Sequence, residues 1–292
     1  MIKIYADAAS NLFPSFLKEY GYDIKVMNMK LEYKDSTVNC YDDDFDIDEF
    51  GKKFYTDMLN DVVPVTSLIN QYDFEEAFTK DIEAGNKIIC FTMAKGISGT
   101  YQSAFVVANE LNNKYGKTLV HVVDSMTAGF GEGLQAIRAY ELAKGGMHFS
   151  ALVKDVEEFK LKVRSEFTCD SIKYLRKTGR IGSAVTRFIN MLSIKIMLRG
   201  GPESTIEMTG ISKGRKSSIK KLADTCLKKI VDPDNQIVYI SHSDCLDEAN
   251  VLKDLLIEGG IKNIRMTMYD FISGTHVGPG AIAVFYIGEN KD

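Results

Sequence analysis

The chain has 292 residues, of which 45% are hydrophobic and 26% are charged, as is usual for a water-soluble globular protein. Its formal net charge of −4 argues against nucleic acid or an anionic membrane surface as the main partner. No apolar run approaches the roughly 18 residues that a membrane helix needs, the five cysteines form no Cys-x-x-Cys pair, and the chain starts without the features of a signal peptide. We therefore expect a cytoplasmic protein with reduced thiols and no stable membrane insertion.

The first half of the chain alternates between strand-like and helix-like segments. Short apolar runs rich in β-branched residues predict strands, and apolar residues at spacings of three and four predict helices. Such alternation favours a mainly parallel sheet with helices on its faces. The expected strands are 2–6, 24–33, 87–93 and 118–123, and the expected helices are 14–19, 48–60, 73–83, 100–115 and 133–144.

The second half has a different pattern. Gly200-Gly201-Pro202 joins two strand candidates directly, which is typical of an antiparallel hairpin. Its expected helices are 150–163, 214–230 and 247–259, and its expected strands are 166–170, 193–199, 205–211, 236–241, 263–271 and 281–287. We predict an α/β protein of two domains, with a mainly parallel sheet in residues 1–158 and an antiparallel sheet in residues 159–292.

A histidine among glycines is the first candidate for chemistry. His276 lies in Phe271-Ile-Ser-Gly-Thr-His-Val-Gly-Pro-Gly280, just before the last expected strand. Histidine can offer a donor or a charge near neutral pH, and a glycine-rich turn lets another molecule approach the backbone. We expect a loop here, with His276 under little side-chain cover and beside a small anionic group.

Two further segments supply hydroxyl and amide donors. Ser98-Gly99-Thr100 lies between a strand and a helix, where free amides suit a carboxylate or phosphate, although Ser98 can also serve only as the helix cap. Thr66, expected in a loop, can likewise serve only its neighbouring backbone. If Thr66 and Ser98 converge, they form a neutral donor pair that matches a carboxylate.

Several familiar catalytic patterns are incomplete in this chain. The segment 96–100 lacks the final glycine of a serine nucleophile elbow, and 129–133 lacks the glycine spacing of a dinucleotide loop. The acidic residues at 42–46 lack the glycine and glutamate of a calcium loop, and no histidines stand at metal-ligand spacing. We expect no metal, no cofactor and no catalytic residue. The basic clusters 176–180 and 213–216 could receive a phosphate or an acidic partner.

Taken in order, these motifs resemble the DegV family, the fatty-acid-binding proteins that serve bacterial fatty acid kinase. The most specific segments are Ile97-Ser-Gly-Thr-Tyr-Gln-Ser-Ala104 and Gly274-Thr-His-Val-Gly-Pro-Gly-Ala281. Weaker matches, significant because of their order, are Asp7 to Leu12, Thr66-Ser67, Val123-Asp-Ser125, Tyr174-Leu-Arg-Lys-Thr-Gly-Arg-Ile181 and Lys213-Gly-Arg215. The resemblance covers essentially the whole chain.

The resemblance implies a fatty acid in an apolar tunnel at the junction of the two domains. Carried over by position, Thr66, Ser98 and Gly99 would hold the carboxylate, and His276 would lie beside the head group. Arg215, together with His276, would present the acid to a separate kinase subunit that forms the acyl phosphate. The chain would then be a carrier and not an enzyme.

Some positions depart from the family pattern. Asp7-Ala8-Ala9 stands where Asp-Ser-Thr is usual, and Thr66-Ser67-Leu68-Ile69-Asn70 lacks the usual proline. Two alternatives therefore stay open. One is a binding protein for another anionic amphiphile, and the other is a stand-alone phosphotransferase or hydrolase that uses His276.

Overall fold

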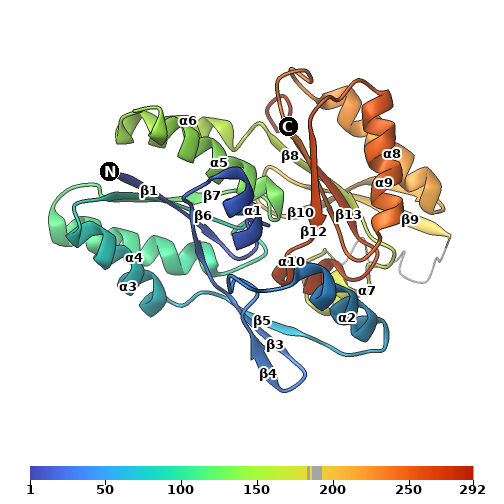
Figure 1. The fold of residues 1–292 in the computed structure, drawn as a ribbon, viewed down its shortest axis with the longest axis horizontal. Helices are drawn as coiled ribbons and strands as arrows, with labels where there is room; N and C mark the ends of the chain where they lie inside the picture. The colour runs from blue at the N-terminus through green and yellow to red at the C-terminus, as the bar shows by residue number, and fades with distance from the viewer. Residues whose placement is uncertain (183–184, 186–192, 292) are drawn as a thin grey trace.

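Two large sheets lie side by side in the computed structural model, which describes residues 1–182, 185 and 193–291 (Figure 1). The four-stranded sheet has the order β2-β1-β6-β7 and is parallel throughout, as predicted. Its strands are β1 (Ile2–Asp7), β2 (Lys25–Met27), β6 (Lys87–Thr92) and β7 (Val120–Asp124).

Helices cover both faces of the parallel sheet. The helices α3 (Gln71–Glu83) and α4 (Thr100–Tyr115) pack on one face, and α5 (Phe130–Lys144) and α6 (Phe149–Phe159) on the other (Figure 1). Successive residues of β6 alternate between the two apolar layers, with Ile88 and Cys90 in one and Ile89 and Phe91 in the other. A strand with both faces buried in this way needs a continuous apolar run, which the sequence of β6 provides.

The helix α5 packs between the two large sheets, against β1 and β6 on one side and against strands of the second sheet, β8 (Val163–Thr168), β11 (Val238–His242) and β13 (Ile282–Ile287), on the other. Its glycines permit this close packing. A Cβ at Gly133 would lie 2.4 Å from the Ser10 carbonyl oxygen, and one at Gly131 would lie 2.4 Å from Thr127 Oγ1. The 129–133 glycines thus open a tightly packed helix.

The six-stranded sheet has the order β10-β9-β8-β13-β11-β12. Every neighbouring pair is antiparallel except β11–β12, which is parallel, and β9–β10 form the predicted hairpin. The helices α8 (Arg215–Lys229) and α9 (Leu246–Glu258) cover its outer face. The strands are β8 (Val163–Thr168), β9 (Ile194–Gly200), β10 (Ile206–Lys213), β11 (Val238–His242), β12 (Ile264–Met268) and β13 (Ile282–Ile287).

A third, three-stranded antiparallel sheet has the order β4-β3-β5, with strands β3 (Lys30–Tyr33), β4 (Ser36–Val38) and β5 (Val65–Ser67). The expectation of a loop around Thr66 was wrong, because Thr66 pairs with the fully buried Leu31 and is drawn into a strand. The other helices are α1 (Pro14–Tyr20), α2 (Ile47–Leu59), α7 (Lys173–Lys177) and α10 (Phe271–Val277).

The expectation of a loop around His276 was also wrong. Residues 271–277 form α10, because the carboxylate of Asp270 accepts a hydrogen bond of 2.6 Å from the Ser273 amide and caps the helix. The side chain of His276 is partly buried, not open to solvent. The glycine-rich turn is confined to the residues after the helix, where Gly278 and Gly280 have φ of 78° and 74°.

The strands of the parallel sheet all precede residue 125, and those of the six-stranded sheet all follow residue 162. One apolar cluster contains residues from both halves, so the boundary at 158/159 stays a prediction.

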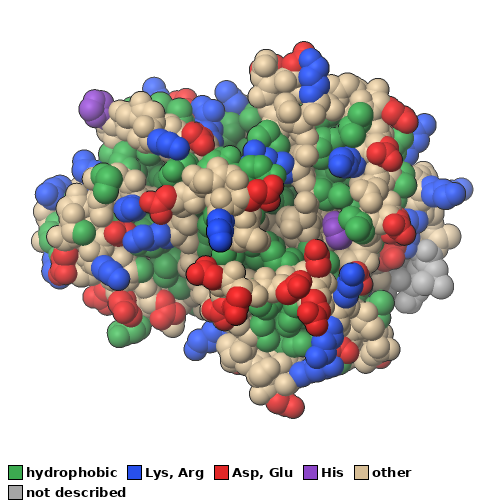
Figure 2. All heavy atoms as spheres, in the orientation of Figure 1, with side chains coloured by type: hydrophobic (Ala, Val, Ile, Leu, Met, Phe, Trp, Pro, Cys, Tyr) green, Lys and Arg blue, Asp and Glu red, His purple; other side chains and the backbone are tan. Residues whose placement is uncertain are grey.

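All five cysteines are buried and unpaired. Within the described ranges no helix is long and apolar enough to cross a membrane. Positive and negative side chains intermingle over the face that Figure 2 shows.

Candidate ligand-binding site

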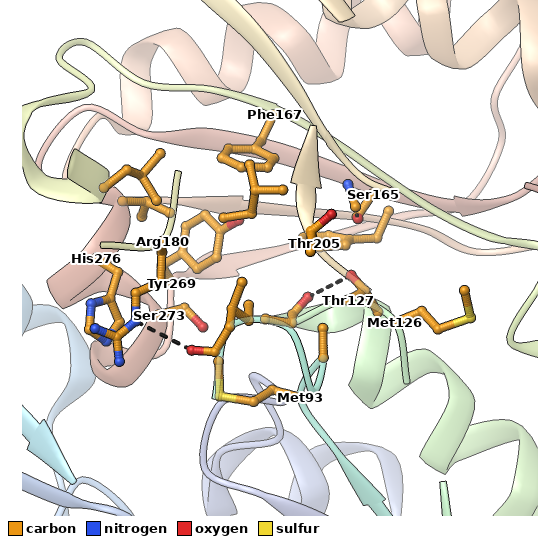
Figure 3. A pocket seen from close by; sticks show the side chains of 18 residues that line it. Met93, Met126, Thr127, Ser165, Phe167, Arg180, Thr205, Tyr269, Ser273 and His276 are labelled. Atoms are coloured by element: carbon orange, nitrogen blue, oxygen red, sulfur yellow. Dashed lines mark hydrogen bonds between the residues drawn. The ribbon is translucent and has the colours of Figure 1, made fainter. Parts of the chain in front are cut away.

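A cavity of about 60 Å³, open to solvent on part of its boundary, lies where the two large sheets meet. The lining residues come from the loops after β6 and β7, from α7 and α10, and from the six-stranded sheet (Figure 3). They are Met93, Ala94, Ile97, Met126, Thr127, Ala128, Ser165, Phe167, Leu175, Arg180, Gly200, Thr205, Ile206, Tyr269, Ser273, His276, Val277 and Phe285.

Most of the cavity wall is apolar. Phe167, Leu175 and Phe285 contribute side chains that are buried in the protein, and Met93 and Val277 extend the same surface. Each methylene group that leaves water for such a wall gains about 0.8 kcal/mol. An apolar group is therefore the kind of ligand part that this wall favours.

One end of the cavity, here called the polar end, contains His276, Arg180 and Ser273, which lie close together in Figure 3. Thr66 Oγ1 lies 3.0 Å from His276 Nε2. Thr66 therefore does not line the cavity itself but forms a hydrogen bond with a residue that does. The other ring nitrogen, His276 Nδ1, and the hydroxyl of Ser273 are buried without a hydrogen-bond partner among the described residues. These two groups remain available to a ligand.

Burial and the neighbouring charge keep His276 neutral. Burial lowers the pKa of His276, and the Arg180 guanidinium lowers it further, to about 4. The ring is therefore uncharged at neutral pH and can donate one hydrogen bond and accept another. In this site Arg180 provides the positive charge and His276 a neutral polar group.

Arg180 is a site residue that the sequence analysis placed in a basic cluster without assigning it to the ligand. Its Nε donates to the Ile97 carbonyl over 3.3 Å, and its Nη1 donates to the carbonyl of Thr178. The first contact joins the segment around α7 to the loop that contains Ser98. The signal in the sequence was that this arginine directly follows a glycine, Gly179. The glycine has φ of 72° in the structure, and this conformation turns the chain just before Arg180.

The Ser98–Gly99 loop lies next to this polar end but does not line the cavity itself. Ser98 Oγ accepts a hydrogen bond of 3.2 Å from the Thr100 amide, but the N-cap of α4 is Gly99, so the expectation that Ser98 itself caps the helix was wrong. A Cβ at Gly99 would lie 3.0 Å from Leu68, two residues after Thr66. The loop and β5 are therefore neighbours, and the amides of the first turn of α4 have no acceptor within the helix.

Arg215 stands apart from the cavity. It begins α8, where its Nη2 lies 3.6 Å from Cys245 Sγ. Its Nη1 and Nε lie 3.8 Å from carboxylate oxygens of Asp170 and Glu248, respectively. Of the predicted site residues, the structure thus brings Thr66 and His276 together, places Ser98 and Gly99 beside them, and leaves Arg215 outside the cavity wall.

Comparison with known proteins identifies the family. A family model described as "Uncharacterised protein, DegV family" matches residues 1–289. A DegV domain-containing protein of Clostridium perfringens is 33% identical over 290 residues, which are 99% of this chain and 98% of the relative. The chain belongs to the DegV family. A second DegV domain-containing protein, from Clostridium acetobutylicum, is 29% identical over 97% of each chain.

Solved DegV structures share the fold of this DegV chain. A DegV family protein from Thermus thermophilus, described as fatty acid binding, has a TM-score of 0.83 at 20% identity and covers 98% of this chain and 99% of its own. A stearic-acid-binding protein from Eubacterium ventriosum has a TM-score of 0.83 at 21% identity, with 99% of both chains covered. A DegV protein from Ruminococcus gnavus with vaccenic acid has a TM-score of 0.80 at 24% identity, with 97% and 99% covered.

Among the described residues of this DegV chain, no three His, Cys, Asp or Glu side chains are grouped as a metal site requires.

Proposed function

We propose that this DegV protein binds a long-chain fatty acid in the cavity between its sheets, with the carboxylate at the polar end. The observation that carries the proposal is a largely apolar cavity wall with a histidine, an arginine and a serine, His276, Arg180 and Ser273, together at one end. The fatty acids in the related structures from Eubacterium ventriosum and Ruminococcus gnavus support the same ligand class.

The donors at the polar end suit a carboxylate. In our proposal His276 and Arg180 contact it directly, Thr66 orients the imidazole, and Ser98 and Gly99 supply hydroxyl and amide groups from the start of α4. The acyl chain provides most of the affinity through burial, so the head group needs only a few oriented donors. The protein itself performs no chemistry in this account and needs no cofactor.

We propose further that a separate fatty acid kinase phosphorylates the bound carboxylate to an acyl phosphate. Arg215 fits a role toward that partner because it lies on α8 outside the cavity and its ion pairs with Asp170 and Glu248, at 3.8 Å, are long. Arg215→Ala should leave fatty acid affinity unchanged and slow acyl phosphate formation when a bacterial fatty acid kinase and ATP are supplied. Loss of fatty acid binding in Arg215→Ala would contradict this division of roles.

Direct binding measurements test the carboxylate site. Stearic acid is titrated into delipidated protein and into Arg180→Gln, with Arg176→Gln as the matched control, because Arg176 is exposed on α7. A hydrogen bond to a charged group contributes about 1.5–3 kcal/mol, so Arg180→Gln should weaken binding by roughly ten- to a hundred-fold. Equal affinities for Arg180→Gln and the wild-type protein would refute the assignment.

A further inference from the structure

The end of the cavity opposite His276 contains a residue in a strained backbone conformation. Met126, which lies at that end in Figure 3, has φ of 60°, in the left-handed region that non-glycine residues seldom adopt. Such a conformation persists only where surrounding contacts fix it, and it often occurs at sites that hold a ligand.

Two hydrogen bonds fix the backbone of Met126. Its amide donates to Asp124 Oδ1 over 3.0 Å, and its carbonyl accepts from Lys291 Nζ over 3.0 Å. Asp124 is held in turn by the hydroxyl of Ser204, which donates to Oδ2 over 2.6 Å, and by the amide of Lys95, which donates to Oδ1 over 3.2 Å. Hydrogen bonds to both the amide and the carbonyl of Met126 thus hold the loop after β7 in place.

Lys291 is brought to this position by the segment that follows β13. The Gly288 amide donates to the Lys162 carbonyl over 2.9 Å, and the Lys291 amide donates to the Leu161 carbonyl over 2.7 Å. Arg164 Nη2 donates to the Asn290 carbonyl over 2.6 Å. These contacts hold residues 288–291 beside β8, so that the Lys291 side chain reaches the loop after β7.

The cavity wall also becomes more polar at this end. The hydroxyls of Thr127, Ser165 and Thr205 replace apolar side chains there, as Figure 3 shows. A Cβ at Gly200 would lie 2.7 Å from Ser165 Oγ and 3.1 Å from the Met126 carbonyl oxygen, so Gly200, Ser165 and the Met126 backbone pack closely at this end. A hydrocarbon chain gains free energy only as far as the apolar wall continues.

We propose that Met126, clamped by Asp124 and Lys291, is the stop that sets the maximum length of the bound acyl chain. This inference rests on the proposed fatty acid function and names a specificity determinant within the same cavity. The clamp acts through backbone geometry: Lys291 is a positioning residue that fixes the carbonyl of Met126, while Met126 forms the wall.

The test compares the affinities of myristic, palmitic, stearic and arachidic acids for the wild-type protein, Lys291→Met and Met126→Gly. Glycine adopts the left-handed conformation readily, so Met126→Gly removes the side chain from the wall without straining the loop. Lys262→Met is the matched control, because Lys262 is an exposed lysine that pairs with Asp234 on the surface. The thermal unfolding temperature of each variant confirms that it folds.

Both test variants should shift the preference toward longer acids. The affinity ratio of arachidic to palmitic acid should rise about four-fold for each additional methylene that the cavity accepts, and Lys262→Met should keep the wild-type ratio. An unchanged ratio in folded Lys291→Met and Met126→Gly, with palmitic acid still bound, would overturn the clamp and leave the proposed function intact. Failure of the wild-type protein to bind any of the four acids would overturn both.

Discussion

The buried carboxyl group that caps α10 should make the stability of the fold depend on pH. Asp270 is fully buried, and one of its oxygens accepts the Ser273 amide while the other has no hydrogen-bond partner among the described residues. Burial raises its pKa from 3.8 to about 7, and the nearby carboxyl of Asp7 adds to the effect. Glu132, also fully buried, has a pKa well above its usual value because of burial and of Asp7.

The direction of the effect follows from proton uptake. Between pH 3.8 and about pH 7 the folded protein keeps the Asp270 proton that the unfolded chain has lost. The free energy of unfolding therefore falls as the pH rises through this window, by about 1.4 kcal/mol per pH unit. Across the whole window the free energy of unfolding decreases by about 4 kcal/mol. This contribution is present in acid and is lost once Asp270 ionises in the folded protein.

Asp270→Asn removes this dependence without removing the cap, because asparagine caps helices about as well as aspartate. Relative to the wild-type protein, the variant should gain about 3 kcal/mol in free energy of unfolding between about pH 5 and about pH 8. Urea denaturation followed by circular dichroism measures the difference at each pH. Asp46→Asn is the control, since Asp46 caps α2 in the same way, accepting the Glu49 amide at 2.9 Å, but is exposed. A constant difference between Asp270→Asn and wild type across this range would refute the reasoning.

Three further predictions follow from the site. Because burial lowers the pKa of His276 from 6.5 to about 4, the unfolded chain takes up this proton first as the pH falls. His276→Gln should therefore gain about 2 kcal/mol over wild type in urea denaturation between pH 7 and about pH 5; no gain would contradict the assignment. A Cβ at Gly274 would lie 2.2 Å from the Tyr55 hydroxyl oxygen, so Gly274→Ala should cost about 1–3 kcal/mol in the same assay. Tyr55→Phe in the same chain should restore part of that loss, and equal stability of single and double variants would argue against this clash. Ser98→Ala should weaken stearic acid binding by about 0.5–1.5 kcal/mol in calorimetry, while unchanged binding would limit Ser98 to its local hydrogen bond with the Thr100 amide.

The sequence predicted those elements whose own residues determine them. The helix expected at 48–60 is α2, Ile47–Leu59, because Phe54 and Met58 repeat on one buried face and Asp46 caps its start. The segment 263–271 was predicted as one strand, but the strand ends at Met268 and α10 begins at Phe271. Glycine and β-branched residues disfavour a helix there, and it forms because of the buried cap and its packing against the core.

The candidate site was predictable only in part, because its contacts join distant segments. Thr66 and His276 are 210 positions apart in the chain, and only the fold places them 3.0 Å from each other. Arg180 carried a signal as part of a basic cluster, but nothing local separates it from Arg176, which is exposed. The role of Met126 depends on a backbone conformation and on a contact with Lys291, neither of which has a sequence signature.

The most direct test of the proposed function is mass spectrometry of the purified protein, first native and then after denaturation and solvent extraction. We expect one bound molecule with the mass of a long-chain fatty acid, absent from a parallel preparation of Arg180→Gln or reduced there. A protein that remains empty even after incubation with stearic acid, or that carries a different anionic amphiphile, would contradict the assignment of the cavity to fatty acids.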